Sequence, residues 1–136
     1  MAKFRVNGNT TISITDASAA RAMAAYVEEL SGFGKAFAML DILQLNGTAP
    51  TFAVGLQEAA RFTLRGKYDD TATTGPHVVF TGLLGDATAR AFSFSPDGTK
   101  TLSGNCRLVR YEVTARHGEM VMYEAEFVSD GALTWG

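Results

Sequence analysis

The sequence has 136 residues, of which 46% are hydrophobic and 19% are charged. This length and composition are typical of one globular domain, residues 1–136, that buries a core without disulfides or metal. The net charge of −2 excludes the basic surface of most nucleic-acid-binding domains, and the single cysteine excludes an intrachain disulfide.

The first part of the chain is predicted to form two short strands and a helix. Residues 4–6 and 10–15 read as strands, and Asn7-Gly8-Asn9 favours a turn between them because asparagine and glycine tolerate positive φ. Residues 17–30 are rich in alanine and repeat apolar side chains at helical spacing. The pattern therefore predicts a helix over residues 17–30.

Residues 31–58 carry many apolar side chains without a clear period. Most of them lie in residues 35–45 and 52–56, which Asn46-Gly47 separates. Two interpretations stay open. The segment is either a loop that covers the core of its own subunit or a flexible segment that buries its side chains on a neighbouring subunit.

The middle of the chain is predicted to form a strand, a helix and a second strand. Residues 59–68 alternate apolar and polar side chains, as a half-buried strand does. Gly75-Pro76 opens a predicted helix over residues 77–84, because proline is favoured in the first helical turn. Residues 88–95 then form a strand, and a turn follows at residues 96–99.

The strongest pattern is the period-two alternation over residues 101–134, which predicts two long strands joined by a tight turn at His117-Gly118. One face is apolar and is expected to pack inside the subunit. Its residues are Val109, Tyr111, Val113, Tyr123 and Phe127. The opposite face is polar, and its charged residues are Arg110, Glu112, Glu124 and Glu126.

No group of residues has the spacing of a catalytic or metal site. His77 and His117 lie beside turns or a helix start and are expected to be exposed to solvent. Asp69-Asp70 point in opposite directions on an extended chain, which favours a role in capping the loop. Cys106 is predicted on the polar face of its strand, without the cationic neighbour that activates a thiol. The sequence therefore predicts no enzyme, no cofactor and no metal.

Four short motifs occur in a fixed order along most of the chain. They are Lys67-Tyr68-Asp69-Asp70-Thr71 with Gly75-Pro76, Phe92-x-Phe94-x-Pro96-x-Gly98-Thr99, Leu108-x-x-Tyr111-Glu112-Val113-Thr114, and Phe127 with Gly131-Ala132-Leu133-Thr134-Trp135-Gly136. In this order and spacing the motifs resemble those of tail tube proteins (major tail proteins) of long-tailed phages. Residues 41–47 depart from the family pattern, and the family keeps residues 25–27 extended rather than helical.

The resemblance implies a mainly β fold, an antiparallel β-sandwich or half-barrel with one or two short helices. It also implies that several subunits, typically six, join edge to edge into a ring around a lumen, and that rings stack into a tube. Ring closure removes the exposed strand edges that make a monomer prone to aggregation.

The implied assembly gives two sets of candidate residues. The candidates for contact between subunits are Phe33, Phe37, Met39, Leu43, Phe52, Leu56 and Trp135. The candidates for the lumen wall are Arg110, Glu112, Glu124 and Glu126. The mildly acidic balance of the chain suits a lumen through which DNA slides without adhering.

The resemblance further implies partners and a location. The partners are further copies of the chain, tape measure and tail terminator proteins, and DNA in passive contact, without membrane insertion. The protein would be made in the host bacterial cytoplasm and reside in the virion tail. Three alternatives stay open: another particle protein of similar fold (head decoration, distal tail or injection tube), a β-sandwich module that binds a sugar or small ligand in a pocket lined by aromatics, and a hydrolase that uses His77 or His117.

Overall fold

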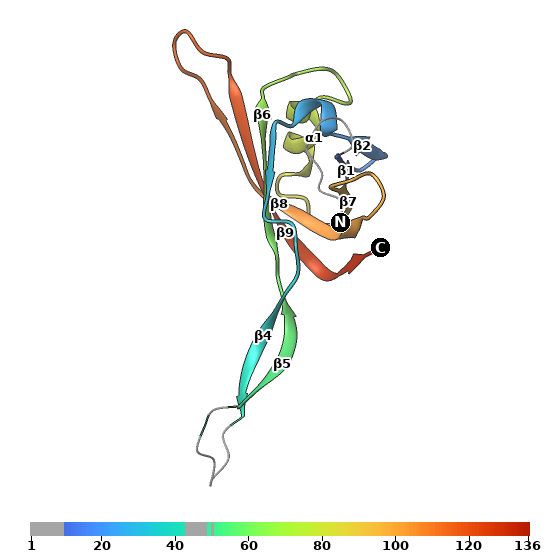
Figure 1. Ribbon diagram of the computed structural model, residues 1–136. Coiled ribbons are helices and arrows are strands. Elements are labelled where there is room, and N and C mark those ends of the chain that lie inside the picture. The colour runs from blue at the N-terminus through green and yellow to red at the C-terminus, as the bar shows by residue number, and fades with distance from the viewer. Residues whose placement is uncertain (1–9, 43–48, 50) are drawn as a thin grey trace.

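The computed structural model describes residues 10–42, 49 and 51–136, and within them the main element is an antiparallel sheet of seven strands (Figure 1). The elements are β1 (Thr11–Thr15), β2 (Ala20–Ala22), η1 (Ala24–Tyr26), β3 (Glu29–Ser31), β4 (Ala36–Ile42), β5 (Thr51–Glu58), β6 (Arg61–Lys67), α1 (Pro76–Leu83), β7 (Arg90–Ser95), β8 (Leu102–Thr114) and β9 (Met122–Trp135). The sheet order is β2-β1-β7-β8-β9-β6-β3, and β4 and β5 form a separate pair. The predicted mainly β fold is confirmed.

The two long strands β8 and β9 connect the two halves of the sheet. The first part of β8, residues 102–106, pairs with β7, whereas the first part of β9, residues 122–128, pairs with β6. The sheet curls, so that Phe92 on β7 and Phe62 on β6 have ring centroids 4.8 Å apart although two strands separate them in the sheet. This curl produces the expected half-barrel.

Aromatic side chains fill the half-barrel from two directions. Phe33 stacks on Phe62 and on Phe94, with ring centroids 4.4 Å and 4.2 Å apart. From the side of α1, Phe80 packs 5.5 Å from Tyr123 and 5.7 Å from Phe127. Because Phe62 and Phe127 also stack, at 5.1 Å, the aromatic side chains form one continuous core.

The predicted helix over residues 17–30 is wrong, because the chain folds back there onto β1. The carboxylate of Asp16 accepts hydrogen bonds of 2.8 Å from the backbone N–H groups of Ser18 and Ala19. The turn that these bonds close brings β2 alongside β1, and β3 then pairs with β6. Tertiary strand pairing outweighs the helix propensity of the alanines, as it commonly does for a weak local preference. The resemblance to the tail tube family implied an extended chain at residues 25–27. That expectation agrees better with the structure than a long helix does, although residues 24–26 form the short helix η1.

A β-bulge in β8 explains why the predicted inner face is partly wrong. Leu108 pairs with Phe127 and Arg110 pairs with Glu126, so that Val109 has no partner of its own. The bulge reverses which positions point inward: Cys106 is buried before it, Tyr111 packs on the core after it, and Val109 is exposed. Cys106 therefore lies in the core rather than on the polar face.

Val113 lies on the inner face but is 45% exposed, since the end of β8 and the start of β9 extend beyond the body of the subunit (Figure 1). Its expected burial inside the subunit is wrong. The other predicted elements are confirmed, namely the strands of β1, β6 and β7, the helix α1 and the pair β8–β9. The turn after β7 places Gly98 at φ 82°, as expected. The strand and turn predicted over residues 4–9 lie outside the described residues.

We expect the variant Gly66→Ala to be destabilised. A Cβ at this position would overlap the backbone oxygen of Tyr26 and lie 3.1 Å from Cε1 of Tyr123, whose hydroxyl donates a 2.8 Å hydrogen bond to that same oxygen. Overpacking of this kind costs about 1–3 kcal/mol, measurable as a lower denaturant midpoint. Gly82→Ala is the control: it points into open space in α1 and should be neutral or stabilising. Equal losses in the two variants would contradict this account.

Candidate assembly surfaces

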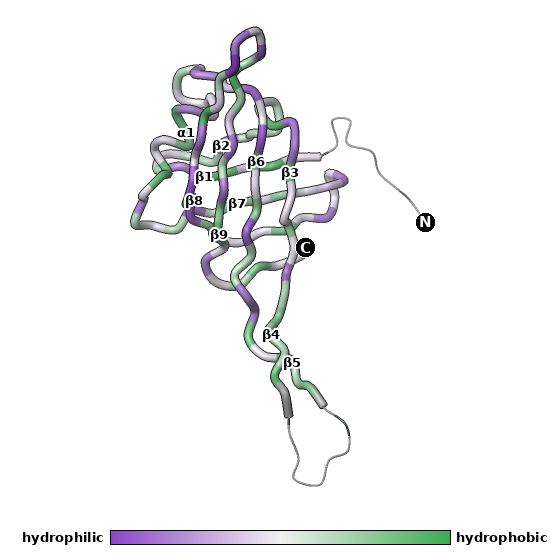
Figure 2. The backbone as a smooth tube through the Cα atoms, turned by 90° about the vertical axis from the view of Figure 1, so that its left-hand side faces the viewer, coloured by the Kyte–Doolittle hydropathy of each residue, from purple (hydrophilic) through white to green (hydrophobic). Residues whose placement is uncertain are grey.

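The β4–β5 hairpin extends away from the main sheet and consists mostly of hydrophobic residues (Figure 2). Several of its large apolar side chains are exposed. Met39 pairs with Val54, and Phe52 lies two residues before Val54, so these three share one face, while Leu56 follows Val54 at the register shift of β5. Their exposed fractions are 68%, 74%, 55% and 87% respectively. A row of large apolar side chains this exposed is typical of a surface that binds a partner.

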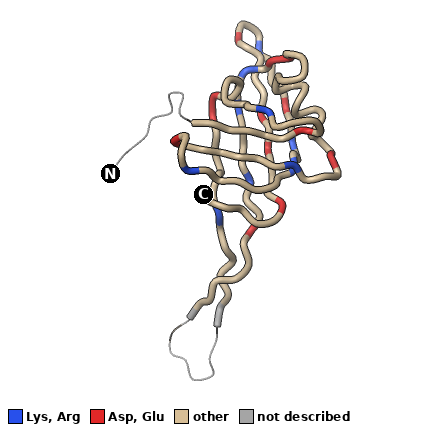
Figure 3. Tube along the Cα trace, turned by 90° about the vertical axis from the view of Figure 1, so that its right-hand side faces the viewer, with Lys and Arg blue, Asp and Glu red and all other residues tan. Residues whose placement is uncertain are grey.

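Charged side chains are concentrated on the main sheet and its loops, whereas the described part of the hairpin is almost free of them (Figure 3). Phe37 lies two residues before Met39 on β4 and is also exposed, and Leu40 is exposed on the opposite face. The hairpin is therefore apolar on both faces. The interpretation of residues 31–58 as a core-covering loop is wrong for β4 and β5.

The predicted contact residues fall into three groups. Phe37, Met39, Phe52 and Leu56 are exposed on the hairpin, and Trp135 is 47% exposed at the end of β9. Phe33 instead stacks on two phenylalanines of its own subunit, so its ring is already packed. Leu43 lies outside the described residues. Sequence reasoning missed Leu40 and Val54, although the alternation of Phe52, Val54 and Leu56 was a usable signal.

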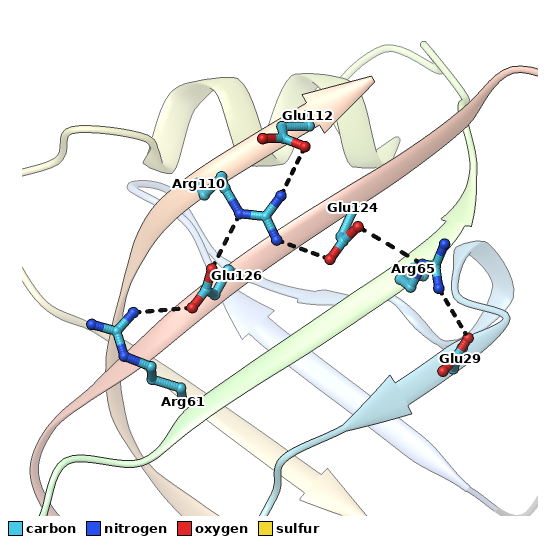
Figure 4. A network of polar contacts seen from close by, with 7 residues as sticks. All are labelled: Glu29, Arg61, Arg65, Arg110, Glu112, Glu124 and Glu126. Carbon is cyan, nitrogen blue, oxygen red and sulfur yellow. Dashed lines mark hydrogen bonds and ion pairs between the residues drawn. The ribbon is translucent and has the colours of Figure 1, made fainter. Parts of the chain in front are cut away.

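The four predicted lumen residues come together on the outer face of β8 and β9 (Figure 4). The guanidinium of Arg110 lies 2.8 Å from Glu112, 2.8 Å from Glu124 and 3.1 Å from Glu126. Glu126 also pairs with Arg61 on β6, at 3.0 Å. Hydrogen bonds from Arg110, and then from Arg61, lower the pKa of Glu126. The three glutamates in turn raise the pKa of Arg110, so the network favours the charged forms of Glu126 and Arg110.

The ion pairs continue across β6 to β3. Arg65 on β6 lies 3.9 Å from Glu124 and 3.6 Å from Glu29, and Lys67 lies 3.3 Å from Glu28. With the four residues above and Arg61, this charged face has five carboxylates and four cationic groups. On this face β9 is negative, β6 is positive and the start of β3 is negative, whereas β8 carries Arg110 beside Glu112, so the face has almost no net charge.

The strands that carry the charged face have unpaired edges on both sides. β7 pairs with β8 only as far as Cys106, so within the described residues the rest of β8 has no strand on that side. β3 pairs with β6 alone among the described strands. The layer β8-β9-β6-β3 therefore ends in two backbone edges that are free to accept further strands.

The polar residues considered for chemistry are dispersed or buried. His77 is half-buried rather than exposed, and its Nδ1 lies 3.2 Å from the hydroxyl of Tyr111. Asp69 caps its own loop by accepting a 2.8 Å hydrogen bond from the N–H of Thr71. Burial raises the pKa of the Cys106 thiol to about 12. Among the described residues, no group of three or more His, Cys, Asp and Glu side chains is placed to hold a metal ion, and no helix there is long and apolar enough to span a membrane.

We expect Arg110→Gln to destabilise the subunit most at neutral pH, because it leaves three carboxylates close together without their shared cation. The lowered pKa of Glu126 in the folded state stabilises the fold at pH values above the unfolded-state pKa of that carboxyl group. This contribution is lost as the pH falls. The difference from the unmodified protein should therefore shrink below about pH 4. Denaturant titrations at neutral and acidic pH measure it.

Lys67→Gln is the matched control, since it removes a cation with a single partner at 3.3 Å. Its effect should be small and change less with pH. A pH-independent loss in Arg110→Gln would show that the arginine acts through packing rather than charge.

Several solved structures that share this fold come from virion, tail and tube assemblies, whereas no protein-family model and no curated protein sequence matches the chain. A chain from the virion of a native gene transfer agent (GTA) particle aligns with a TM-score of 0.75 at 16% identity, over 97% of this chain and 99% of that chain. A chain from the tail of an empty GTA particle, described with C6 symmetry, gives a TM-score of 0.73 at 16% identity over the same shares. A chain from the sheath–tube complex of PVC, an extracellular contractile injection system, gives 0.69 at 11% identity, over 99% and 93%.

At identities this low, the structural alignments show a shared fold and no more. They support the resemblance to tail tube proteins at a coarse level, through gene transfer agents and contractile injection systems rather than long-tailed phages in particular. The chain has the fold of these tail and tube components.

Proposed function

We propose that the chain is a structural subunit of a tail tube, in which copies join into rings and the rings stack around a lumen. The observation that carries this proposal is the layer β8-β9-β6-β3, which has a charged outer face and two unpaired edges. A single domain with such edges is prone to uncontrolled association unless a partner covers them.

The strand directions support closure into a ring. Each neighbouring pair in the layer is antiparallel, and the layer has four strands. In a ring of identical copies, the β8 edge of one subunit therefore runs antiparallel to the β3 edge of the next. A heterologous contact of this kind closes into a ring when its rotation is a whole fraction of a turn. Six copies is our preferred number, because the GTA tail chain comes from an assembly with C6 symmetry.

The hairpin supports stacking of the rings. β5 leads into β6 through Ala59 and Ala60, so the hairpin continues the layer along the strand direction (Figure 1). Its apolar side chains would become buried on the adjacent ring. To this contact between rings we assign Phe37, Met39, Phe52 and Leu56, and we add Leu40 and Val54. Trp135 remains a further candidate for contact between subunits.

The charged face is our candidate for the lumen wall. Its positive and negative side chains largely neutralise one another, so a polyanion would meet neither a strong attraction nor a strong repulsion. Arg110, Glu112, Glu124 and Glu126 would then face the lumen, with DNA as the passing polymer. We expect the protein to work in the tail of a virion or virion-like particle, with tape measure and terminator proteins as partners.

A second candidate is a component that ends a tube rather than forming its length. A chain from the PVC sheath/tube terminator has the same fold at a TM-score of 0.67, and a chain from the cap that terminates the tube of the anti-feeding prophage does so at 0.69. Both share the fold at 11% and 10% identity. Negative-stain microscopy of concentrated protein separates the two candidates: stacked tubes support the tube subunit, and single rings that do not stack support a terminal component. A strictly monomeric protein would contradict both.

We expect Leu56→Glu to prevent stacking without unfolding the subunit. Leu56 is 87% exposed, so the fold does not depend on it, whereas a buried unpaired carboxylate between rings is costly. Microscopy should show rings without tubes. Glu58→Gln, at the end of the same strand, is the control and should stack normally. Normal tubes from Leu56→Glu would show that this face of the hairpin stays exposed.

A further inference from the structure

A groove of about 400 Å³ opens between β3, the start of β1 and the end of β7. Its walls are mainly apolar. They include Ile12, Ala24, Val27, Leu30, Phe94 and Pro96. Thr10, Glu28 and Glu29 also line it. The groove lies between the core cluster, which includes Ile12, and the charged face, which includes the two glutamates, and it is open, so it is a candidate surface for a partner.

The groove lies on the core side of β3. Leu30 points toward the core and packs against it, whereas Glu29, its neighbour, pairs with Arg65 on the charged face. A strand added to the free edge of β3 would continue the same sheet. Any element that covers the core side of that added strand would then lie beside the groove.

Helix α1 is such an element, because it covers the core side of β8 and β9. Phe80 packs on Tyr111 and Tyr123, with ring centroids 5.8 Å and 5.5 Å apart. The helix leaves Val78 41% exposed, and Leu84, directly after it, is 44% exposed. Both apolar side chains lie outside the core of their own subunit.

We propose that α1 of one subunit docks in this groove of the next subunit around the ring, with Val78 and Leu84 against its apolar walls. This inference rests on the proposed ring and specifies the contact that closes it. The β8 edge would pair with the neighbour's β3 edge, and α1 would cover the groove on the same side of the joined sheet. The junction then has two layers, one of backbone hydrogen bonds and one of apolar packing.

The charges at one end of the junction fit this arrangement. Glu28 and Glu29 lie where β3 begins, and Arg116 lies two residues beyond the end of β8. Antiparallel pairing of β8 with β3 places these two strand ends at the same end of the junction. Arg116 is exposed and makes no ion pair with any described residue, so it is available to the two glutamates of a neighbour.

Pairs of introduced cysteines test the contact in the full-length protein. Val78→Cys or Leu84→Cys is combined with Ala24→Cys, all at exposed positions, and the assembled protein is treated with a short bismaleimide. Cys106 is buried and its thiol has a raised pKa, so it should not react. We expect a ladder of dimers and higher oligomers on a denaturing gel.

The single-cysteine variants are matched controls. In a heterologous contact a residue meets a different residue of the neighbour rather than its own copy, so each single variant should give no ladder. Microscopy of the same samples distinguishes a failure of the α1 contact from a failure of the proposed function. Rings without a ladder would overturn the docking of α1 and leave the tube subunit standing, with the groove filled by another segment. Absence of rings in the unmodified protein would overturn the proposed function itself.

Discussion

The antiparallel pairing of β8 with β9 is the contact on which the rest of the structure depends. These strands carry β7 on one side and β6 on the other, and their inner face supports α1. The bulge at Val109 lets one strand serve both halves, because it keeps Cys106 and Leu108 in the core before the bulge and Tyr111 against the core after it. Without this change of phase, the inner side chains of one half would point to solvent.

The same pairing separates two kinds of surface by their chemistry. Inside, aromatic rings pack within about 6 Å of one another and bury apolar area. Outside, Arg110 holds three carboxylates that would otherwise repel one another across β8 and β9. Exposed ion pairs add little stability one by one, but a shared cation links adjacent strands and sets the charge of the face. In the proposed tube, this face would meet the passing polymer.

The β4–β5 hairpin follows a different principle, since none of its described apolar side chains packs on the core of its own subunit. A two-stranded hairpin is marginal by itself, and its apolar faces are exposed among the described residues. Burial on another copy would supply the missing contacts, which couples the order of the hairpin to assembly. The free edges of β8 and β3 have the same dependence, so the proposed ring and stack would complete a fold that the single chain leaves open.

The sequence by itself determined the elements whose signals are local. Alternation over residues 101–134 predicted β8 and β9, Gly75-Pro76 predicted the start of α1, and the alternating charges predicted a polar outer face. Only the tertiary structure decided the rest. Residues 17–30 are not a helix because pairing with β1 and β6 outweighs alanine's propensity, and the bulge at Val109 reversed the inward phase because register depends on the partner strand. Likewise, only packing shows that Phe33 is held in its own core while Leu56 is exposed, since hydrophobicity alone does not distinguish a core side chain from a contact side chain.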